Sequence, residues 1–386
     1  MTGEAWRAFC RRLEAAGDRL LDDDFPGSPR DRAEGVRHLA RLAVFGLQWA
    51  LEFADPDFPA FHRYDDDIVK WGGPNVDNTY LRARIRGDAA YRIWGRAPHV
   101  SDFILSTHEG DMQLEQYGVF AERSLRDLVV ARDGSFDVFL GGQERGPGWV
   151  PLDPAATHVL VRQYFDDWDE QEPAELHIEQ VDRSADAPAA LAPERVADGL
   201  EEAAEWIERS LVYWNDYLRR MRDAAPANQL SPPTTPPGGA SDILYGGGFW
   251  ELDEDQALVV ECEVPEARSW SIQLYTLGWF ESLDVLNRQG SLNGRQIHVD
   301  GDGRFRVVLS HADPRVPNWL DTEGRHEGSL SYRWVWSSTS PAPSTSVVAL
   351  DEVREHLPDD HPSVTAAERR ERIADRRVHL ERRFRR

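Results

Sequence analysis

Lysine, cysteine and long apolar runs are scarce in this sequence. Lys70 is the single lysine, so a lysine Schiff base or a phosphate-loop lysine would have to be that residue. The two cysteines, Cys10 and Cys262, are too few for a disulfide framework and lack metal-ligand spacing, which favours a reducing, cytoplasmic location. The apolar stretch at 43–50 is far shorter than the roughly 20 residues that cross a bilayer, and the N-terminus has no signal-peptide core. We therefore expect no membrane partner.

Positive charge is also in deficit, because 68 acidic residues against 44 basic ones give the chain a net charge of −24. An extended surface complementary to a phosphate backbone is therefore not expected, and neither is a nucleic-acid partner. The 386 residues, 41% of them hydrophobic, suffice for two or three globular domains with cores of their own.

Helical periodicity is present in three segments. Residues 1–55 form a helical lead-in, in which Cys10 takes a core position and Ser28 caps a second helix whose apolar stripe includes Val36. Residues 193–222 repeat apolar side chains at spacings of four and three, which predicts one long amphipathic helix. Residues 225–240 contain five prolines and no charge, which predicts a linker.

The third helical segment is the tail, for which Ser363 is the expected cap. Residues 364–386 hold nine arginines against four acids, which leaves about −29 on the rest of the chain. One interpretation is that this helix docks on an acidic surface of its own chain or of a sister subunit, forming a homo-oligomer. The alternative is a basic arm that binds an anionic partner.

Strand periodicity dominates between these segments. The alternation in residues 81–85 resumes at Tyr91 after a turn at Gly87, which predicts a β-hairpin. The glycine run 246–248 is interpreted as a turn, since no helix follows it to cradle a phosphate.

The two halves of the chain repeat one pattern, which predicts an internal duplication. In each half an Asp-Gly turn precedes an alternating strand, a Pro-x-Trp segment and an arginine strand. The matching residues are Asp133, Phe136, Trp149, Asp153 and Arg162 in the first half, and Asp302, Phe305, Trp319, Asp321 and Arg333 in the second. The pair Tyr91 and Ile93 is matched in the same way to Trp270 and Ile272.

The predicted fold class is mainly β with flanking helices, as two related antiparallel β-sandwich domains of jelly-roll type. The expected divisions are a helical lead-in at 1–55, a first sandwich at 56–185, a helix with its linker at 186–240, a second sandwich at 241–345 and an arginine-rich helix at 346–386.

Acid–base candidates lie in the second half of the chain. His311 and Asp313 could both reach one side of an extended segment, but a zinc site needs a third ligand, and none has suitable spacing. We therefore expect no metal and no cofactor. His311, Asp313 and Asp321 are candidate catalytic residues for proton transfer, because a histidine or a carboxylate can act as a general base or acid.

The best candidate for a ligand pocket joins Asn318, Trp319 and Asp321 with Arg333, because these side chains offer polar and apolar contacts together. Repetition of this pattern around Trp149 favours a structural alternative, in which the tryptophan plugs the sandwich and an Asp–Arg pair closes its rim. Asn318 is special to the second half, since the first half has Gly148 there.

Asn78, Tyr80 and Arg82 form a second polar cluster with ligand-binding potential. The structural alternative is a strand entrance with an exposed arginine face.

Three strings resemble a bacterial family catalogued as domain of unknown function 1214: DNTYLRARIRGDAAYRIWG, FDDWDEQEPAELHIE and SLNGRQIHVDGDGRFRVVLSHADPRVPNWLDTEG. The resemblance covers about residues 70–182 and 241–340. It implies a mostly β, jelly-roll-type sandwich, and it brings no reaction or cofactor. The family pattern is present at Asn78, Tyr80, Asn318, Trp319, Asp321 and Arg333.

Two functions fit these observations. The first is an enzyme of small-molecule catabolism whose acid–base residues act in an aromatic-lined site without a nucleotide cofactor. The second is a non-catalytic protein that binds a small molecule or serves as a scaffold. In either case the overall acidity favours a neutral or cationic, partly apolar ligand.

Overall fold

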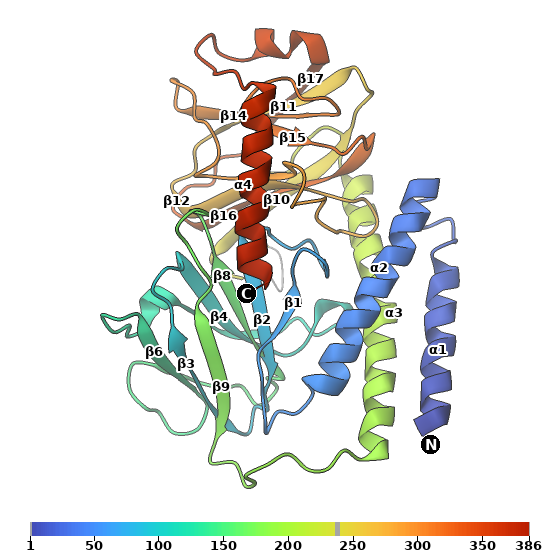
Figure 1. Ribbon diagram of the computed structural model, residues 1–386, viewed down its shortest axis with the longest axis vertical. Helices are drawn as coiled ribbons and strands as arrows, with labels where there is room; N and C mark the ends of the chain where they lie inside the picture. The colour runs from blue at the N-terminus through green and yellow to red at the C-terminus, as the bar shows by residue number, and fades with distance from the viewer. Residues whose placement is uncertain (1, 236–239, 386) are drawn as a thin grey trace. The chain divides into compact units, whose positions relative to one another are not determined.

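The chain folds into two compact units in the computed structural model, which describes residues 2–235 and 240–385. Unit 1 comprises Met1–Trp71, Asn78–Phe165 and Glu170–Trp214, and unit 2 comprises Gly72–Asp77, Asp166–Asp169 and Asn215–Arg386. In Figure 1 the strands of unit 1 run from blue to green and those of unit 2 from yellow to orange.

Unit 1 is built on two sheets that share one core. Its strands are β1 (His62–Asp65), β2 (Asn78–Arg84), β3 (Ala90–Arg96), β4 (Asp102–His108), β5 (Val119–Ser124), β6 (Ser135–Leu140), β7 (Trp149–Val150), β8 (His158–Tyr164) and β9 (Glu175–Val181). Sheet 1a has the order β1-β2-β8-β4-β5 and sheet 1b the order β7-β6-β3-β9. Neighbouring strands are antiparallel except for the parallel pair β6 and β7.

The core of unit 1 lies between these sheets, so unit 1 is a β-sandwich. Apolar side chains at every second position of both sheets meet there, among them Ala83, Tyr91, Phe103, Val138 and Val161. The expected alternation in 81–85 is confirmed, but the β-hairpin is wrong. Strands β2 and β3 belong to different sheets, and alternation shows which residues share a face without showing which strand is the neighbour.

Helices pack beside the sheets of unit 1. They are α1 (Thr2–Arg19), α2 (Pro29–Leu47), the π-helical turn η1 (Gln48–Glu52), the short 3-10 turns η2 (Met112–Leu114) and η3 (Leu125–Asp127), and the part of α3 (Pro193–Ala224) up to Trp214. In Figure 1 α1, α2 and α3 run beside one another. Arg12 of α1 forms ion pairs with Glu201 and Glu208 of α3.

The predictions for the first two helices are confirmed in part. Ser28 caps α2 by accepting a hydrogen bond from the Asp31 amide. The core position of Cys10 is wrong, because its side chain is exposed, and Val36 is also 63% exposed. Apolar spacing located both helices correctly, but in α2 the buried side includes Gly35 and Leu42 rather than Val36.

Unit 2 repeats this plan. Its strands are β10 (Ile243–Glu251), β11 (Gln256–Glu263), β12 (Ala267–Tyr275), β13 (Ser291–Asn293), β14 (Arg304–Ser310), β15 (Trp319–Asp321), β16 (Glu327–Ser337) and β17 (Ser344–Ala349). Sheet 2a has the order β10-β16-β12-β13 and sheet 2b the order β15-β14-β11-β17. A core that includes Leu258, Phe305 and Trp334 lies between them, so unit 2 is also a sandwich. It adds the 3-10 helix η4 (Leu350–His356) and α4 (Ala366–Arg385).

The strand orders of the two units coincide when eight is added to each number from β2 to β9. The one parallel pair also recurs, because Phe139 faces Trp149 in unit 1 and Val308 faces Trp319 in unit 2. The match of Tyr91 to Trp270 is out of register, since β3 corresponds to β11 and Trp270 lies on β12. An aromatic followed by isoleucine is too short a signal to fix strand order.

The glycine run 246–248 lies inside β10, so its interpretation as a turn is wrong. Cβ atoms there would collide with Tyr332, with the Leu330 carbonyl and with the Gln229 carbonyl. The glycines therefore permit close approach of neighbouring chain rather than a reversal of direction. Part of the predicted linker packs closely against β10, because Leu230 forms a β-bridge with Gly248 and Thr234 forms one with Tyr245. Residues 236–239 of that linker lie outside the described residues.

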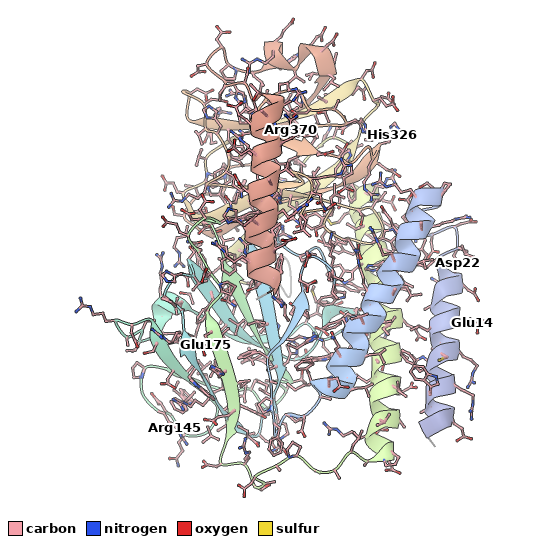
Figure 2. The ribbon with its side chains drawn as sticks, in the orientation of Figure 1. Glu14, Asp22, Arg145, Glu175, His326 and Arg370 are labelled. Carbon is pink, nitrogen blue, oxygen red and sulfur yellow. The ribbon has the colours of Figure 1, made fainter. Side chains whose placement is uncertain are left out.

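Helix α4 docks on unit 2 through its arginines. Arg369 forms an ion pair with Asp313, Arg376 donates to the Val285 carbonyl and Arg383 donates to the Val76 carbonyl. Arg370, labelled in Figure 2, is exposed. The cap is Thr365, which exchanges hydrogen bonds with Glu368, rather than the expected Ser363. No helix in 2–235 or 240–385 is long and apolar enough to span a membrane.

Candidate functional site

The three acid–base candidates of unit 2 all have partners from elsewhere in that unit. His311 bonds to the Leu252 carbonyl and the Thr322 hydroxyl, each at 3.1 Å. Asp313 holds Arg369 of α4. Asp321 accepts from Arg288 at 2.8 Å and from the Glu323 amide. These contacts tie loops and α4 to the sandwich.

The predicted pocket around Trp319 is not assembled as expected. Trp319 and Asp321 lie on sheet 2b, whereas Arg333 lies on sheet 2a and bonds to the Tyr275 hydroxyl and the Gly73 carbonyl, both at 2.7 Å. The prediction that Asp321 and Arg333 pair at the rim of the sandwich is therefore wrong, because Asp321 pairs with Arg288. Trp319 packs with Val353 in a cluster separate from the main core, so it does not plug the sandwich.

Asn318 is buried and fully engaged. Its amide nitrogen donates to the His298 and Arg306 carbonyls, and its amide oxygen accepts from the His298 backbone N–H, all at 2.8 Å. Its role is therefore to fix the chain at His298.

The second polar cluster lies on β2 of unit 1. Asn78, Tyr80 and Arg82 alternate with core residues, so they share the outer face of sheet 1a. The prediction of an exposed arginine face is wrong for Arg82. Its side chain is only 1% exposed, because residues of α2, η1 and α3 cover it.

Arg82 is the centre of this buried group. Its guanidinium carbon lies 3.7 Å from the ring centroid of Trp49 and 4.4 Å from that of Phe45. Its Nη1 donates to both carboxylate oxygens of Asp111 at 3.1 Å. Trp206 of α3 donates to the same carboxylate at 2.7 Å. The two charges are thus paired beneath an aromatic cover.

Burial and pairing act in opposite directions on these two groups. Burial lowers the pKa of Arg82, although Asp111 works against this shift. Burial by itself would raise the pKa of Asp111, but the charge of Arg82 and the hydrogen bonds from Trp206 and Arg82 outweigh it and lower that pKa to about 2. Asp111 is therefore ionised at neutral pH.

Two histidines lie on the same sheet face. The rings of His108 and His158 stack with centroids 5.1 Å apart and planes 4° apart, on the paired strands β4 and β8. Burial lowers the pKa of His108 to about 4 and that of His158 well below its usual value, and nearby arginines add to both shifts. Both imidazoles are therefore neutral at pH 7.

One edge of the buried Arg82 guanidinium is unpaired. Nε and Nη2 have no hydrogen-bond partner among the residues that the structure describes. The side-chain amides of Gln113, two residues after Asp111, and of Asn78 on β2 also lack partners there. A buried unpaired donor costs about 1–3 kcal/mol, and more when it is charged, so this group is incomplete by itself.

Sequence reasoning identified Arg82 but missed its partners. Asp111, His108 and His158 come from separate strands and turns, and no spacing in the sequence links them to β2. The tryptophans, Trp49 and Trp206, fall on the buried faces of helical segments, which is the one signal that could have pointed to them.

A further group of metal-ligand type lies in unit 2. His298, Asp300 and His361 offer ligand atoms that all lie within 4.8 Å of one another, and no ligand spacing in the sequence revealed this group.

Comparisons with known proteins support the family resemblance in the second of its two spans. Residues 250–338 match a family model described as "Protein of unknown function (DUF1214)". The crystal structure of an uncharacterised protein from Burkholderia cenocepacia is 34% identical, with a TM-score of 0.84, and the match covers 90% of this chain and 97% of that one. The VPA0106 protein from Vibrio parahaemolyticus is 14% identical, with a TM-score of 0.45 over 81% of this chain and 99% of its own. No curated protein matches the chain.

Proposed function

The chain belongs to the DUF1214 family of proteins of unknown function, and within that family we propose that unit 1 binds a small molecule through a carboxylate. The proposal rests on Nε and Nη2 of Arg82, two buried donors that lack hydrogen-bond partners among the described residues. On this edge of the guanidinium two N–H bonds point in parallel, which matches the two oxygens of a carboxylate.

The surroundings of Arg82 favour an organic acid with an apolar body. Aromatic rings of Phe45, Trp49 and Tyr64 lie within 5.1 Å of the guanidinium carbon. The amides of Gln113 and Asn78 could pair with further polar groups of the ligand. This ligand differs from the neutral or cationic one favoured by overall charge, because the local donors at Arg82 outweigh the net charge of a distant surface.

Binding without chemistry is the function that this site supports best. An enzyme of small-molecule catabolism is the second candidate, and the neutral imidazoles of His108 and His158 favour it, since each can accept a proton at pH 7. We do not base this enzyme on His311, Asp313 or Asp321, whose contacts are structural.

Two wider inferences accompany this proposal. We infer that both units arose by duplication of one jelly-roll-like sandwich, because their strand orders coincide. We also propose a reducing, cytoplasmic location, because Cys10 and Cys262 are both free thiols.

Isothermal titration calorimetry of the full chain tests the binding function, with benzoate as the probe and benzylamine as its cationic counterpart. Benzoate should bind with a stoichiometry of one, and benzylamine should not bind. Arg82→Lys keeps the charge but removes the paired donors, so it should weaken benzoate binding by about tenfold or more.

Arg333→Lys is the matched control, because Arg333 is also a buried arginine, and both its Nη1 and its Nη2 donate hydrogen bonds within the chain. It should leave benzoate affinity unchanged. Equal binding of benzoate and benzylamine by the unaltered chain would overturn the proposal without relying on any variant. Binding of neither probe would also count against it.

A further inference from the structure

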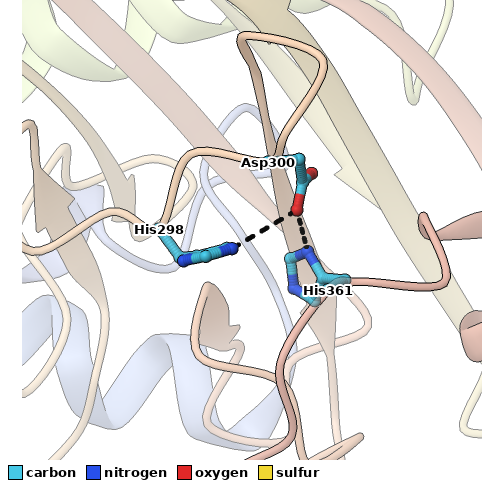
Figure 3. A group of neighbouring side chains, drawn as sticks. All are labelled: His298, Asp300 and His361. Atoms are coloured by element: carbon cyan, nitrogen blue, oxygen red, sulfur yellow. Dashed lines mark hydrogen bonds and ion pairs between the residues drawn. The ribbon is translucent and has the colours of Figure 1, made fainter.

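We propose that His298, Asp300 and His361 of unit 2 form a binding site for a divalent transition-metal ion of the Zn²⁺ type. His298 and Asp300 lie just before the Asp302-Gly303 turn that leads into β14, and His361 follows η4. Figure 3 shows the two imidazoles converging on the carboxylate of Asp300. Two histidines and one carboxylate are a donor set that Zn²⁺ and neighbouring divalent metals use in proteins.

The spacing of the donor atoms suits one ion. His361 Nδ1 lies 2.6 Å from Asp300 Oδ1, and His298 Nε2 lies 3.6 Å from the same oxygen. Ligands at about 2.0–2.2 Å from a zinc ion lie roughly 3–3.5 Å from one another. Small side-chain rotations would therefore bring all three atoms into coordination.

Metal binding would exchange one bond for another at His361. Its Nδ1 donates a hydrogen bond of 2.6 Å to Oδ1 of Asp300. When Nδ1 coordinates the ion, the single proton of the neutral imidazole is carried on Nε2 instead, and the Nδ1 lone pair and the carboxylate oxygen bind the ion. No oxidant or reductant is required.

Other side chains already hold these ligands in place. Arg306 donates to the second oxygen of Asp300 at 2.8 Å, which orients the carboxylate. Asn318 fixes the backbone of His298 by bonding both its N–H and its carbonyl. Such outer contacts are what keep metal ligands oriented.

The site is open on one side. Asp300 and His361 are buried, whereas the His298 side chain is 37% exposed, so an ion can enter past His298. Three protein ligands leave a fourth position for water or a substrate.

Unit 1 has none of these features at the corresponding positions. The bridge between Val299 and Phe305 corresponds to the bridge between Val130 and Phe136. His298 and Asp300 thus correspond to Val129 and Ala131, and Asn318 to Gly148. The ligands His298 and Asp300 and the supporting residue Asn318 thus occur together in unit 2. This favours a binding function for the turn in addition to its structural role.

Two titrations of the full, chelator-treated chain test this site. Calorimetry measures the binding of Zn²⁺, and visible absorption measures the binding of Co²⁺. One ion should bind per chain, and the Co²⁺ spectrum should be that of a four-coordinate site. His298→Ala changes a half-exposed residue and should weaken Zn²⁺ binding by about tenfold to a hundredfold. Asp300→Asn removes a ligand charge while keeping the size of the side chain, so it should also weaken binding.

His326→Ala is the matched control, because His326, labelled in Figure 2, is an exposed histidine of the same unit outside the group. It should bind Zn²⁺ as the unaltered chain does. Absence of stoichiometric Zn²⁺ binding by the unaltered chain would overturn the proposal, as would equal losses in His298→Ala and His326→Ala. The site shares no residue with the Arg82 group, so either proposal can fail alone.

Discussion

The two sandwiches share a strand order but differ in what their outer polar faces do. Tyr80 faces Arg162 in sheet 1a, and the guanidinium carbon lies 5.5 Å from the ring centroid. Tyr245 faces Arg333 in sheet 2a with a spacing of 5.7 Å. This pair occupies equivalent positions in both units, which marks it as part of the common frame.

The neighbouring positions differ. Register places Arg82 of unit 1 opposite Leu160, and the corresponding residue of unit 2 is Gly247, opposite Ser331. By the same registers His108 and His158 correspond to Tyr275 and Ser329. The arginine at position 82 and the two histidines are thus particular to unit 1.

What covers each face explains the difference in hydrogen bonding. In unit 2, the segment Gly72–Asp77 supplies backbone carbonyls, and Arg333, Gln273 and Tyr275 donate to them. In unit 1, aromatic side chains of helices cover Arg82, and aromatic faces cannot accept in-plane N–H bonds. Polar groups that are hydrogen-bonded within the chain, as in unit 2, have a structural role. The unpaired donors of Arg82 in unit 1 favour binding of a ligand.

Removing a large core side chain should have the largest effect on stability. Trp334 is fully buried between the sheets of unit 2, and Trp334→Ala should lower the free energy of unfolding by about 5 kcal/mol. Its counterpart in unit 1 is Gln163, which accepts from the Ala174 amide, so Gln163→Ala should cost only about 2 kcal/mol. Urea denaturation followed by tryptophan fluorescence measures both, and equal losses would contradict the assignment of these positions.

Breaking the buried ion pair should come next. Asp111→Asn leaves Arg82 charged and without a carboxylate, so we expect a loss of about 3 kcal/mol. Thermal and urea denaturation at neutral pH measure the loss. A change below about 0.5 kcal/mol would show that Arg82 finds another partner, and the charge balance described for unit 1 would then be wrong.

Acid should act on unit 1 through its histidines. The folded pKa values of His62 and His108 lie at about 4, below the unfolded value, because burial disfavours the charged form. Between pH 6.5 and 4 the unfolded chain therefore binds more protons, and stability is complete above pH 6.5 and falls as the pH decreases.

Each such histidine contributes up to about 1.4 kcal/mol for every pH unit in this window. His108→Gln should flatten the fall in unfolding free energy between pH 6 and 4.5, as measured by urea denaturation at fixed pH values. An unchanged slope would mean that His108 is protonated in the folded chain.

The smallest effect should come from Asp321→Asn in unit 2. Arg288, the partner of Asp321, is 47% exposed, so the ion pair is screened and its loss should cost about 1 kcal/mol. The same variant should bind benzoate normally in calorimetry. A loss of unfolding free energy as large as that of Asp111→Asn would show that the Asp321–Arg288 pair is not screened, contrary to our expectation.

Local patterns in the sequence predicted the elements, but not their partners. The helix expected at 193–222 is present as Pro193–Ala224, because helical spacing depends on neighbouring residues alone. The β2–β3 hairpin failed because a turn after alternation is equally compatible with a crossing between sheets. Likewise, no sequence signal shows that helices would bury Arg82 on its face of β2.

The sites depended on still more distant contacts. Asp111 reaches Arg82 from a turn 29 residues away, and His361 reaches Asp300 across 61 residues. Asn318 differs from its counterpart, Gly148, and the structure gives a reason for that difference, since the Asn318 amide fixes the backbone of His298. Comparing the two halves thus located one site indirectly, although spacing alone could not.

A crystal structure of the full chain grown with 4-bromobenzoate would show directly whether Arg82 binds a carboxylate. We expect a bromine anomalous peak in unit 1, with the two carboxylate oxygens about 2.8 Å from Nε and Nη2 of Arg82. Water or a side chain on that edge, with bromine absent from unit 1, would contradict this expectation.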